Sequence, residues 1–340
     1  MPRQYQGSII TKSPITPAGP YQCGAASGVW TIDQMVGWQK AGLWPVAGKS
    51  FGTVAIFALG LVSCSASTTR DKVNLTNCSN NSGTAATAAS YCGAATGNIC
   101  TGIFALGYTT SKTATRNKYT YSGCVVASAA SATNASYQGR AAIGNSTVGI
   151  FALGLVCCAC SKVRNKYTYS GDTNASATAA SCNSSRGAAF GNSTRGIFAL
   201  GYVGGVSTTR NKYTYSGDVN SAATASSNGS SYGSATGTST FGIQSLGYSC
   251  AGGTARRNRY IYASCVNSVC FSACSSSTNY NGSAAGNSTF GLFALGKVSV
   301  AVATRDKFTY SNCTLSAGAS ASSASYAGSA ASNGTTGVNV

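Results

Sequence analysis

The sequence repeats itself with a period of about 47 residues from residue 51 almost to its end. Each copy contains an apolar run, best preserved at Gly196–Gly201, and a later element of the form Arg-Asn-Lys-Tyr-Thr-Tyr, best preserved at Arg210–Tyr215. The phenylalanine of the apolar run is replaced by Gln244 in the fifth copy. The arginines that mark the six copies are Arg70, Arg116, Arg164, Arg210, Arg257 and Arg305. A fixed period of this size means that each unit is one supersecondary motif that buries its apolar face against its neighbours.

Each repeat predicts four short strands. The apolar run is bounded by glycines, as is typical of a strand buried on both faces. In the arginine element the period is two, so Arg210, Lys212 and Thr214 share one face while the tyrosines pack on the other. A turn at residues 216–218 follows, then a polar strand, and then an Ala-rich strand such as Arg140–Ile143 that leads to the next apolar run.

Four strands in each of six repeats predict an all-β fold, a six-bladed β-propeller over residues 51–340. The first unit begins at Phe51 without a full Ala-rich strand before it, whereas the last unit stops shortly after one. We therefore expect the two ends of the domain to pair in a single blade, which removes the open edge of the ring. Residues 1–50 form a separate N-terminal docking segment.

The N-terminal segment differs from the repeats in composition. It holds all three tryptophans of the chain, Trp30, Trp38 and Trp44. Residues 31–40 predict a short amphipathic helix, with Thr31 or Asp33 near its start. Three tryptophans in a segment too short for its own core indicate docking, either on a partner or on the repeat domain itself.

The charge of the chain is strongly positive, with 23 Lys and Arg against five Asp, no Glu and no His, which leaves a net charge of +18. Most cations therefore have no carboxylate partner. Such a field attracts polyanions, among them nucleic acid, acidic glycan, lipopolysaccharide and acidic protein surfaces. The alternative is that these side chains serve solubility and pair with carbonyls or tyrosine faces.

An Arg-x-Lys pair recurs in every repeat, and closure of the repeats would arrange the pairs as a ring. One interpretation is a polyanion-binding or partner-docking face. The alternative, which we favour for the arginines, places them between blades, where they cap carbonyl groups; the role of the lysine positions stays open. The candidate ring consists of Lys72, Lys118, Lys166, Lys212, Arg259 and Lys307.

Cysteine is frequent, with 15 residues, and one cysteine position belongs to the repeat. Eight residues after the marker arginine, four copies carry cysteine and two carry aspartate: Cys78, Cys124, Asp172, Asp218, Cys265 and Cys313. Candidate disulfides join Cys64 with Cys78 and Cys250 with Cys265. The cysteines at residues 157–160 lack the spacing of a zinc site, so we interpret them as small buried hydrophobes.

The sequence does not predict an enzyme, a cofactor or a metal site. General acid–base chemistry usually needs His or a carboxylate pair, and this chain has neither His nor Glu. Asp71 and Asp306 occupy the position that asparagine holds in other repeats, while Asp172 and Asp218 lie at predicted turns. No secretory signal or membrane span is visible, so we expect synthesis in the cytosol without export by the general route. Asn-x-Ser/Thr triplets, as at Asn192, are interpreted as a result of composition.

The order Arg-x-Lys-Tyr-x-Tyr, turn, small-residue strand, Gly-Asn-Ser-Thr-x-Gly and Ile-Phe-Ala-Leu-Gly resembles the kelch repeat over residues 51–340. The paired glycines of kelch are mostly reduced to one, as at Gly201, and the blade tryptophan is absent. The resemblance implies a β-propeller. The copper oxidases that share this fold use histidine ligands that the chain lacks.

Residues 7–24, 28–34 and 42–45 resemble the leader of structural proteins from tailed phages, especially cyanophages. This resemblance implies a virion protein of the tail or fibre apparatus, with residues 1–50 docking to other virion proteins and the propeller contacting a partner or an acidic host-surface glycan. Alternatives are a non-viral lectin-like propeller and a capsid-decorating subunit. Homo-oligomerisation is compatible with each. Nucleic acid is disfavoured as a ligand, because the aromatic residues lie on the strand face opposite the cations.

Overall fold

The computed structural model describes residues 30–40, 53–269 and 275–334. Contacts divide the chain into two units, Met1–Phe51 and Gly52–Val340, and each is described by itself. Within the described residues the first unit contains one helix and the second contains 32 strands in small antiparallel sheets. The described structure is therefore β-rich. The expected boundary at residues 50–51 lies outside the described residues and stays a prediction.

The helix α1 spans Ile32–Lys40 and begins with a reciprocal cap. The backbone N–H of Gln34 donates to Thr31 Oγ1 at 3.2 Å, and the N–H of Thr31 donates to Gln34 Oε1 at 3.0 Å. This capping box satisfies two N–H groups that would otherwise have no partner, and Asp33 in the first turn complements the helix dipole. The predicted helix is confirmed. No helix among the described residues is long and apolar enough to cross a membrane.

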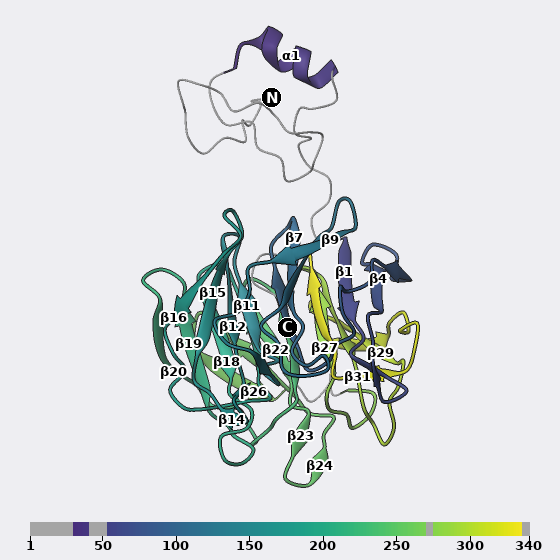
Figure 1. Cartoon of the computed structure of the whole chain (residues 1–340). Coiled ribbons are helices and arrows are strands. Elements are labelled where there is room, and N and C mark those ends of the chain that lie inside the picture. Colours follow the sequence, from purple (N-terminus) through teal and green to yellow (C-terminus); the bar gives the residue numbers. More distant parts are fainter. Residues whose placement is uncertain (1–29, 41–52, 270–274, 335–340) are drawn as a thin grey trace. The chain divides into compact units, whose positions relative to one another are not determined.

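Each repeat of the second unit builds one four-stranded antiparallel sheet (Figure 1). In sheet order, the Ala-rich strand is first, the apolar run second, the arginine strand third and the polar strand fourth. Sheets 1 to 3 contain β32 (Ser329–Ser332), β1 (Val54–Ala58), β4 (Arg70–Asn74) and β5 (Ser79–Gly83); β6 (Ala94–Gly97), β7 (Thr101–Ala105), β8 (Arg116–Thr120) and β9 (Val125–Ala129); and β11 (Ala142–Gly144), β12 (Val148–Ala152), β15 (Arg164–Thr168) and β16 (Thr173–Ala177).

Sheets 4 to 6 repeat this order. They contain β17 (Ala188–Gly191), β18 (Arg195–Ala199), β19 (Arg210–Thr214) and β20 (Val219–Ala223); β21 (Ser234–Gly237), β22 (Phe241–Ser245), β25 (Arg257–Ile261) and β26 (Val266–Val269); and β27 (Ser283–Gly286), β28 (Phe290–Ala294), β29 (Arg305–Thr309) and β30 (Thr314–Ala317). The four-strand content predicted for each repeat is confirmed.

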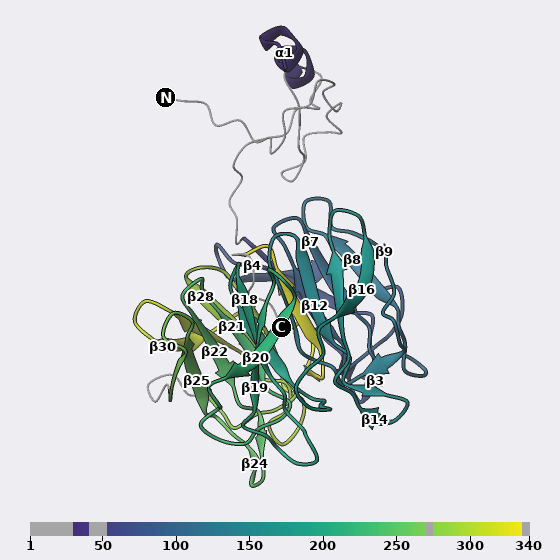
Figure 2. The ribbon, with the colours of Figure 1, turned by 90° about the vertical axis from the view of Figure 1, so that its left-hand side faces the viewer.

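Short two-residue strands form hairpins that project from one end of this unit, at the bottom of Figures 1 and 2, which we call the hairpin end. These strands are β2 (Leu61–Val62) with β3 (Ser65–Ala66) and β31 (Ser325–Tyr326), β13 (Leu155–Val156) with β14 (Ala159–Cys160) and β10 (Ser136–Tyr137), and β23 (Tyr248–Ser249) with β24 (Gly252–Gly253). The turns between third and fourth strands lie at the other end of each sheet.

The first strands contact one another in a cyclic order, β32, β6, β11, β17, β21, β27 and back to β32. No hydrogen-bonded sheet closes on itself in the described residues, but a cycle of backbone hydrogen bonds links all six sheets. One residue just before each first strand donates its N–H to the carbonyl of its counterpart in the preceding sheet, at 2.7–3.0 Å. This hydrogen-bonded ring consists of Cys92, Gln138, Arg186, Tyr232, Asn281 and Ala327.

The ring requires an unusual backbone. All six ring residues have φ between 55° and 60°, and each is followed by a glycine. At Gly328, a Cβ atom would lie 2.1 Å from the carbonyl oxygen of Ala58. Only glycine allows the chain to pass this close to the second strand.

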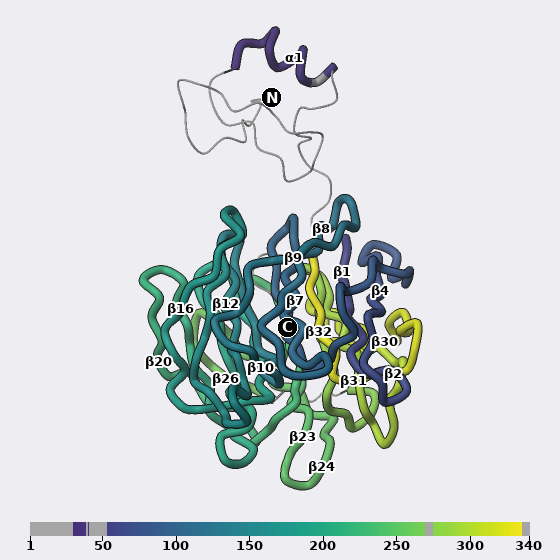
Figure 3. The backbone as a smooth tube through the Cα atoms, viewed as in Figure 1, coloured from purple at the N-terminus to yellow at the C-terminus, as the bar shows by residue number. Residues whose placement is uncertain are grey.

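The two ends of the unit meet in sheet 1, where β32 lies beside β1 (Figure 3). The register places Ala330 opposite Phe57 and Ser332 opposite Ala55. The C-terminal strand thus supplies the first strand that the first repeat lacks. The predicted pairing of the two ends in one sheet is confirmed.

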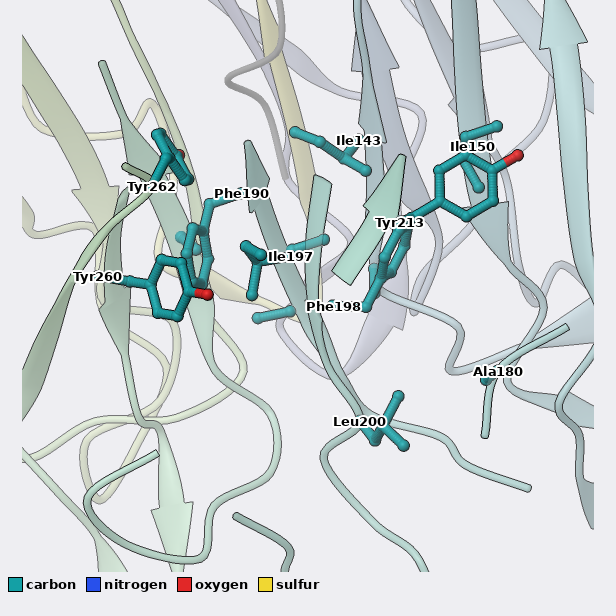
Figure 4. Close-up of a cluster of buried hydrophobic side chains, with 14 residues drawn as sticks. Ile143, Ile150, Ala180, Phe190, Ile197, Phe198, Leu200, Tyr213, Tyr260 and Tyr262 are labelled. Carbon is teal, nitrogen blue, oxygen red and sulfur yellow. The ribbon is translucent and has the colours of Figure 1, made fainter. Parts of the chain in front are cut away.

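The core lies between neighbouring sheets and is built by the second strands. Ile150 of sheet 3 and Ile197 and Phe198 of sheet 4 are at most 1% exposed, and Figure 4 shows them in one cluster with Phe190 and Tyr260. Burial of such a side chain contributes roughly 1.5–3 kcal/mol. Because each sheet packs its faces against two neighbours, the apolar run must be buried on both faces, as predicted.

The Asn-x-Ser/Thr triplets, which were interpreted above as a result of composition, have a structural role. Asn192 Oδ1 accepts hydrogen bonds from the N–H of Thr194 and Arg195 in the turn between first and second strands. Its Nδ2 donates to the carbonyl of Ser239 in the next repeat, at 3.0 Å. The earlier interpretation is corrected: the triplet shapes this turn and joins it to its neighbour.

Candidate functional site

The marker arginines occupy the gaps between sheets. Each begins a third strand and is at most 1% exposed. Its Nη2 donates to the side-chain oxygen of the residue that follows the next marker arginine, at 2.6–3.2 Å. The pairs are Arg70 with Asn117, Arg116 with Asn165, Arg164 with Asn211, Arg210 with Asn258, Arg257 with Asp306, and Arg305 with Asp71. The arginines therefore lie between sheets, as favoured from the sequence, and the acceptor common to all six is a side-chain oxygen.

The same guanidinium groups stack on aromatic rings. Five of them lie 4.3–4.6 Å from the ring centre of the phenylalanine in the next apolar run. A desolvated cation–π contact of this kind contributes about 2 kcal/mol. The pairs are Arg70 with Phe104, Arg116 with Phe151, Arg164 with Phe198, Arg257 with Phe293, and Arg305 with Phe57.

Arg210 is the exception, because Gln244 stands where the other repeats have phenylalanine. Gln244 Oε1 accepts hydrogen bonds from Arg210 Nε at 3.0 Å and from Nη2 at 2.5 Å. The aromatic contact comes instead from Phe190, whose ring centre lies 5.6 Å from the guanidinium. At this interface the second-strand residue therefore hydrogen-bonds the guanidinium, and the aromatic ring comes from the first strand of the preceding sheet.

Only two of these interfaces contain a buried carboxylate. Arg257 bonds Asp306 at 2.9 Å and Arg305 bonds Asp71 at 2.6 Å, with all four side chains almost fully buried. At the other four interfaces burial lowers the arginine pKa to about 10, which leaves the guanidinium charged at neutral pH. Burial also lowers the pKa of Arg305, and Asp71 opposes this decrease. The two ion pairs flank repeat six, on its sides toward repeats five and one.

The six side chains of the candidate ring are half-buried, and Lys72, Lys118 and Lys166 reach toward the next repeat. Lys118 pairs with Asp172 at 3.0 Å and Lys166 with Asp218 at 3.8 Å, while Lys72 Nζ donates to Cys124 Sγ at 2.9 Å. Arg259 and Lys307 lie over phenylalanine rings at 4.3 and 4.5 Å. Lys212 holds the equivalent, half-buried position. These contacts stabilise the packing of the sheets; a polyanion-binding role for the six side chains stays a prediction.

The partners of Lys72, Lys118 and Lys166 lie in the turn between third and fourth strands, where Asp172 and Cys124 have φ of 49° and 51°. The Tyr167 hydroxyl donates to Asp172 Oδ1 at 2.5 Å. Burial would raise the pKa of Asp172, but this hydroxyl, the Ala130 amide and Lys118 lower it below its ordinary value. Burial likewise would raise the pKa of the Cys124 thiol, yet Lys72 beside it produces a net decrease.

The cysteine predictions need correction. Cys64, Cys78, Cys250 and Cys265 are free in the structure, so neither predicted disulfide is formed. Each pair has one member at an exposed hairpin of the hairpin end and the other in a turn at the opposite end of the sheet. Cys157 and Cys158 are exposed instead of being buried, because they are the two turn residues between the paired Val156 and Ala159 of β13 and β14. No group of three metal-ligating side chains occurs in the described residues.

Of the predicted docking residues, Trp30 lies two residues before Ile32, where α1 begins, and Trp38 lies on the helix, half-buried. Trp44 lies outside the described residues. Sequence analysis did not single out Arg140 and Arg186, which lie at the hydrogen-bonded ring. The available signal was local: four residues separate Gly139 from Gly144, whereas three separate the equivalent glycines of repeats two, four, five and six, because Arg140 is inserted.

No protein-family model matches the chain, and no curated protein is significantly similar to it.

Proposed function

We propose that residues 53–334 form a six-bladed, kelch-like β-propeller that serves as a virion structural protein of a phage tail or fibre. The observation that carries the structural part is the cycle of six backbone hydrogen bonds, together with the Arg305–Asp71 pair that joins the last repeat to the first. Such a ring of short, protected sheets is a rigid platform for loops.

The contacts of the four carboxylates in the described β unit support a structural and binding role over a catalytic one. Asp71 and Asp306 form ion pairs with buried arginines. Asp172 and Asp218 form ion pairs with lysines and accept hydrogen bonds from tyrosines. Each carboxylate of the described β unit therefore stabilises packing between neighbouring sheets. A general base needs a carboxylate or imidazole placed against a substrate, and these four serve another purpose.

The N-terminal segment would dock the protein to other virion proteins, and the propeller would present its loops to a partner or an acidic glycan on the host surface. The docking role rests on the leader resemblance and on α1, which exposes Ile32. A non-viral lectin-like propeller and a capsid-decorating subunit are the competing functions.

Immunogold labelling of intact particles tests this proposal. We expect label at the tail or its fibres, and loss of that label when the chain lacks residues 1–50 but still folds. Label over the capsid would indicate that the protein is a capsid-decorating subunit. Absence of label from every particle would contradict the virion role and favour the lectin-like alternative.

A further inference from the structure

A cluster of cations and tyrosines lies at the hydrogen-bonded ring, at the hairpin end. Arg140 follows the ring residue Gln138 by two positions in repeat three, and its Nη2 donates to the carbonyl of Gly282 at 2.7 Å. Gly282 leads into β27 of sheet 6, which is three sheets away from sheet 3 in either direction around the cycle. The side chain therefore crosses the middle of the ring.

Arg140 is an inserted residue, and its charge is poorly compensated. The ring residue is followed by glycine and then directly by the small residues of the first strand in the other repeats, as at Cys92-Gly93-Ala94. Arg140 is 4% exposed, and its Nε and Nη1 are buried without a hydrogen-bond partner in the described part of the chain. A buried guanidinium with two unpaired donors carries a large desolvation cost unless an anion meets it.

A second guanidinium lies beside it. Arg186 is itself a ring residue, and its Nε donates to Gln138 Oε1 at 3.0 Å. Its guanidinium lies 4.9 Å from the centre of the Tyr232 ring and 5.0 Å from that of Tyr202. Arg140 lies 6.0 Å from the same Tyr232 ring, so two cations share one aromatic residue.

Among the described residues, no carboxylate forms an ion pair with this cluster. The four ion pairs found among the described residues involve Lys118, Lys166, Arg257 and Arg305. The thiol of the ring residue Cys92 interacts with Arg140. It does not supply a negative charge, because burial raises the pKa of this thiol. The described residues therefore leave the two guanidinium groups without a negative partner.

Aromatic residues surround the cluster at the hairpin end. Tyr108 packs against Tyr91 at 5.2 Å and against Tyr137 at 5.5 Å between ring centres, and all three are half-buried. Lys297 lies over Tyr326, which precedes the ring residue Ala327. Guanidinium groups bind planar oxyanions with paired hydrogen bonds, and tyrosine rings offer flat apolar faces with a polar tip.

We propose that this end of the molecule binds the carboxylate of an acidic saccharide, with Arg186 and Arg140 as the anion ligands and Tyr232 as the neighbouring stacking surface. The choice of a saccharide rests on the proposed function; the carboxylate site itself rests on the two guanidinium groups and does not depend on a virion role. This site is distinct from the candidate ring of lysine positions between the sheets.

Isothermal titration of the full chain with a glucuronate oligomer tests the proposal, with the same oligomer reduced to neutral alcohols as the matched probe. We expect binding of the acidic oligomer, loss with the neutral one, and weakening by added salt. Arg186→Gln should weaken binding at least about tenfold, as expected when one charge-assisted contact is lost. Arg256→Gln, at an exposed arginine that bonds Asn228, should leave binding unchanged.

Substitute variants and a second acidic probe complete the experiment. If Arg140→Gln fails to fold, Arg186→Gln and Tyr232→Ala, each checked by thermal unfolding, carry the test. Equal binding of the neutral oligomer, or wild-type binding by Arg186→Gln, would overturn the site. Binding of polyglutamate as tight as that of the glucuronate oligomer would overturn the saccharide and indicate an acidic peptide. Because gold labelling of particles does not involve this site, failure here and failure of the virion role are separable.

Discussion

Asp71 and Arg305 lie 234 residues apart in the sequence and form a buried ion pair at 2.6 Å, which joins the first repeat to the last. Asp71 also accepts hydrogen bonds from the N–H and hydroxyl of Ser322. In repeat two the same position holds Asn117, which binds Arg70 with equivalent geometry. The interface that closes the cycle thus uses a carboxylate where most others use an amide.

Asp71→Ala should destabilise the protein strongly. It leaves Arg305 buried without a counter-charge, and removal of one partner of a buried pair costs about 3–5 kcal/mol. Asp71→Asn should cost less, because it recreates the acceptor that Asn117 provides for Arg70. Urea unfolding of both variants measures the difference. Equal losses for the two variants would show that the charge, and not the acceptor geometry, decides this interface.

Gln244→Phe should be destabilising alone and rescued by a second change. The single variant removes one of the acceptors of Arg210, the only one that its Nε has among the described residues, and crowds Phe190. Phe190 lies against Gly242 so closely that a Cβ there would meet it at 2.0 Å. Gln244→Phe with Phe190→Thr restores the arrangement between the second and third repeats, which have Thr96 and Phe151 at these positions. We expect a coupling of about 1–3 kcal/mol in a double-mutant cycle of unfolding free energies. If the losses of unfolding free energy in the two single variants simply add, residues 190 and 244 are not coupled and the prediction is wrong.

Cys124 should react with iodoacetamide at neutral pH faster than the exposed Cys157 of the β13–β14 turn. Burial would raise the pKa of Cys124, but Lys72 at 2.9 Å lowers it, so more thiolate is present. Lys72→Ala should slow alkylation of Cys124 and leave Cys157 unaffected; mass spectrometry of the modified peptides follows both sites. Cys124→Asp should preserve stability, since Lys118 and Asp172 already form this pair in the next repeat. If Cys124 is alkylated at the same rate in Lys72→Ala as in the native protein, Lys72 is not the cause of its reactivity.

Asp172 and Asp218 should make stability depend on acid pH. Burial would raise their pKa values, but the tyrosine hydroxyls, backbone amides and lysines around them lower both. A carboxylate whose folded pKa is below its unfolded value, about 3.9, stabilises the fold above that pH. The contribution is lost as pH falls through the folded pKa.

Urea unfolding at several pH values between about 2.5 and 7 measures this dependence, over a window chosen to bracket the ordinary carboxylate pKa. The variant Asp172→Asn with Asp218→Asn should be less stable at neutral pH and should show a flatter decline below about pH 4. The same acid slope in the variant and the native protein would assign the pH dependence to other groups.

Much of the local structure follows from the sequence. The alternation in Arg210–Tyr215 predicted its strand, and the Thr31-Ile-Asp-Gln34 stretch contains the cap of α1. The missing first strand before Phe51 predicted the pairing of β32 with β1. The disulfides were wrong, because spacing along the chain does not reveal that the two cysteines of each candidate pair lie at opposite ends of a sheet.

By itself the sequence determined the repeat length, the four strands of each repeat and the positions of the marker arginines, because these depend on local side-chain periodicity. The tertiary structure alone decided that Cys92, Gln138, Arg186, Tyr232, Asn281 and Ala327 form one ring. Their side chains share no chemistry, since the ring is made by backbone groups. It also decided that the inserted Arg140 meets the opposite sheet, a contact between segments 142 residues apart that no local pattern records.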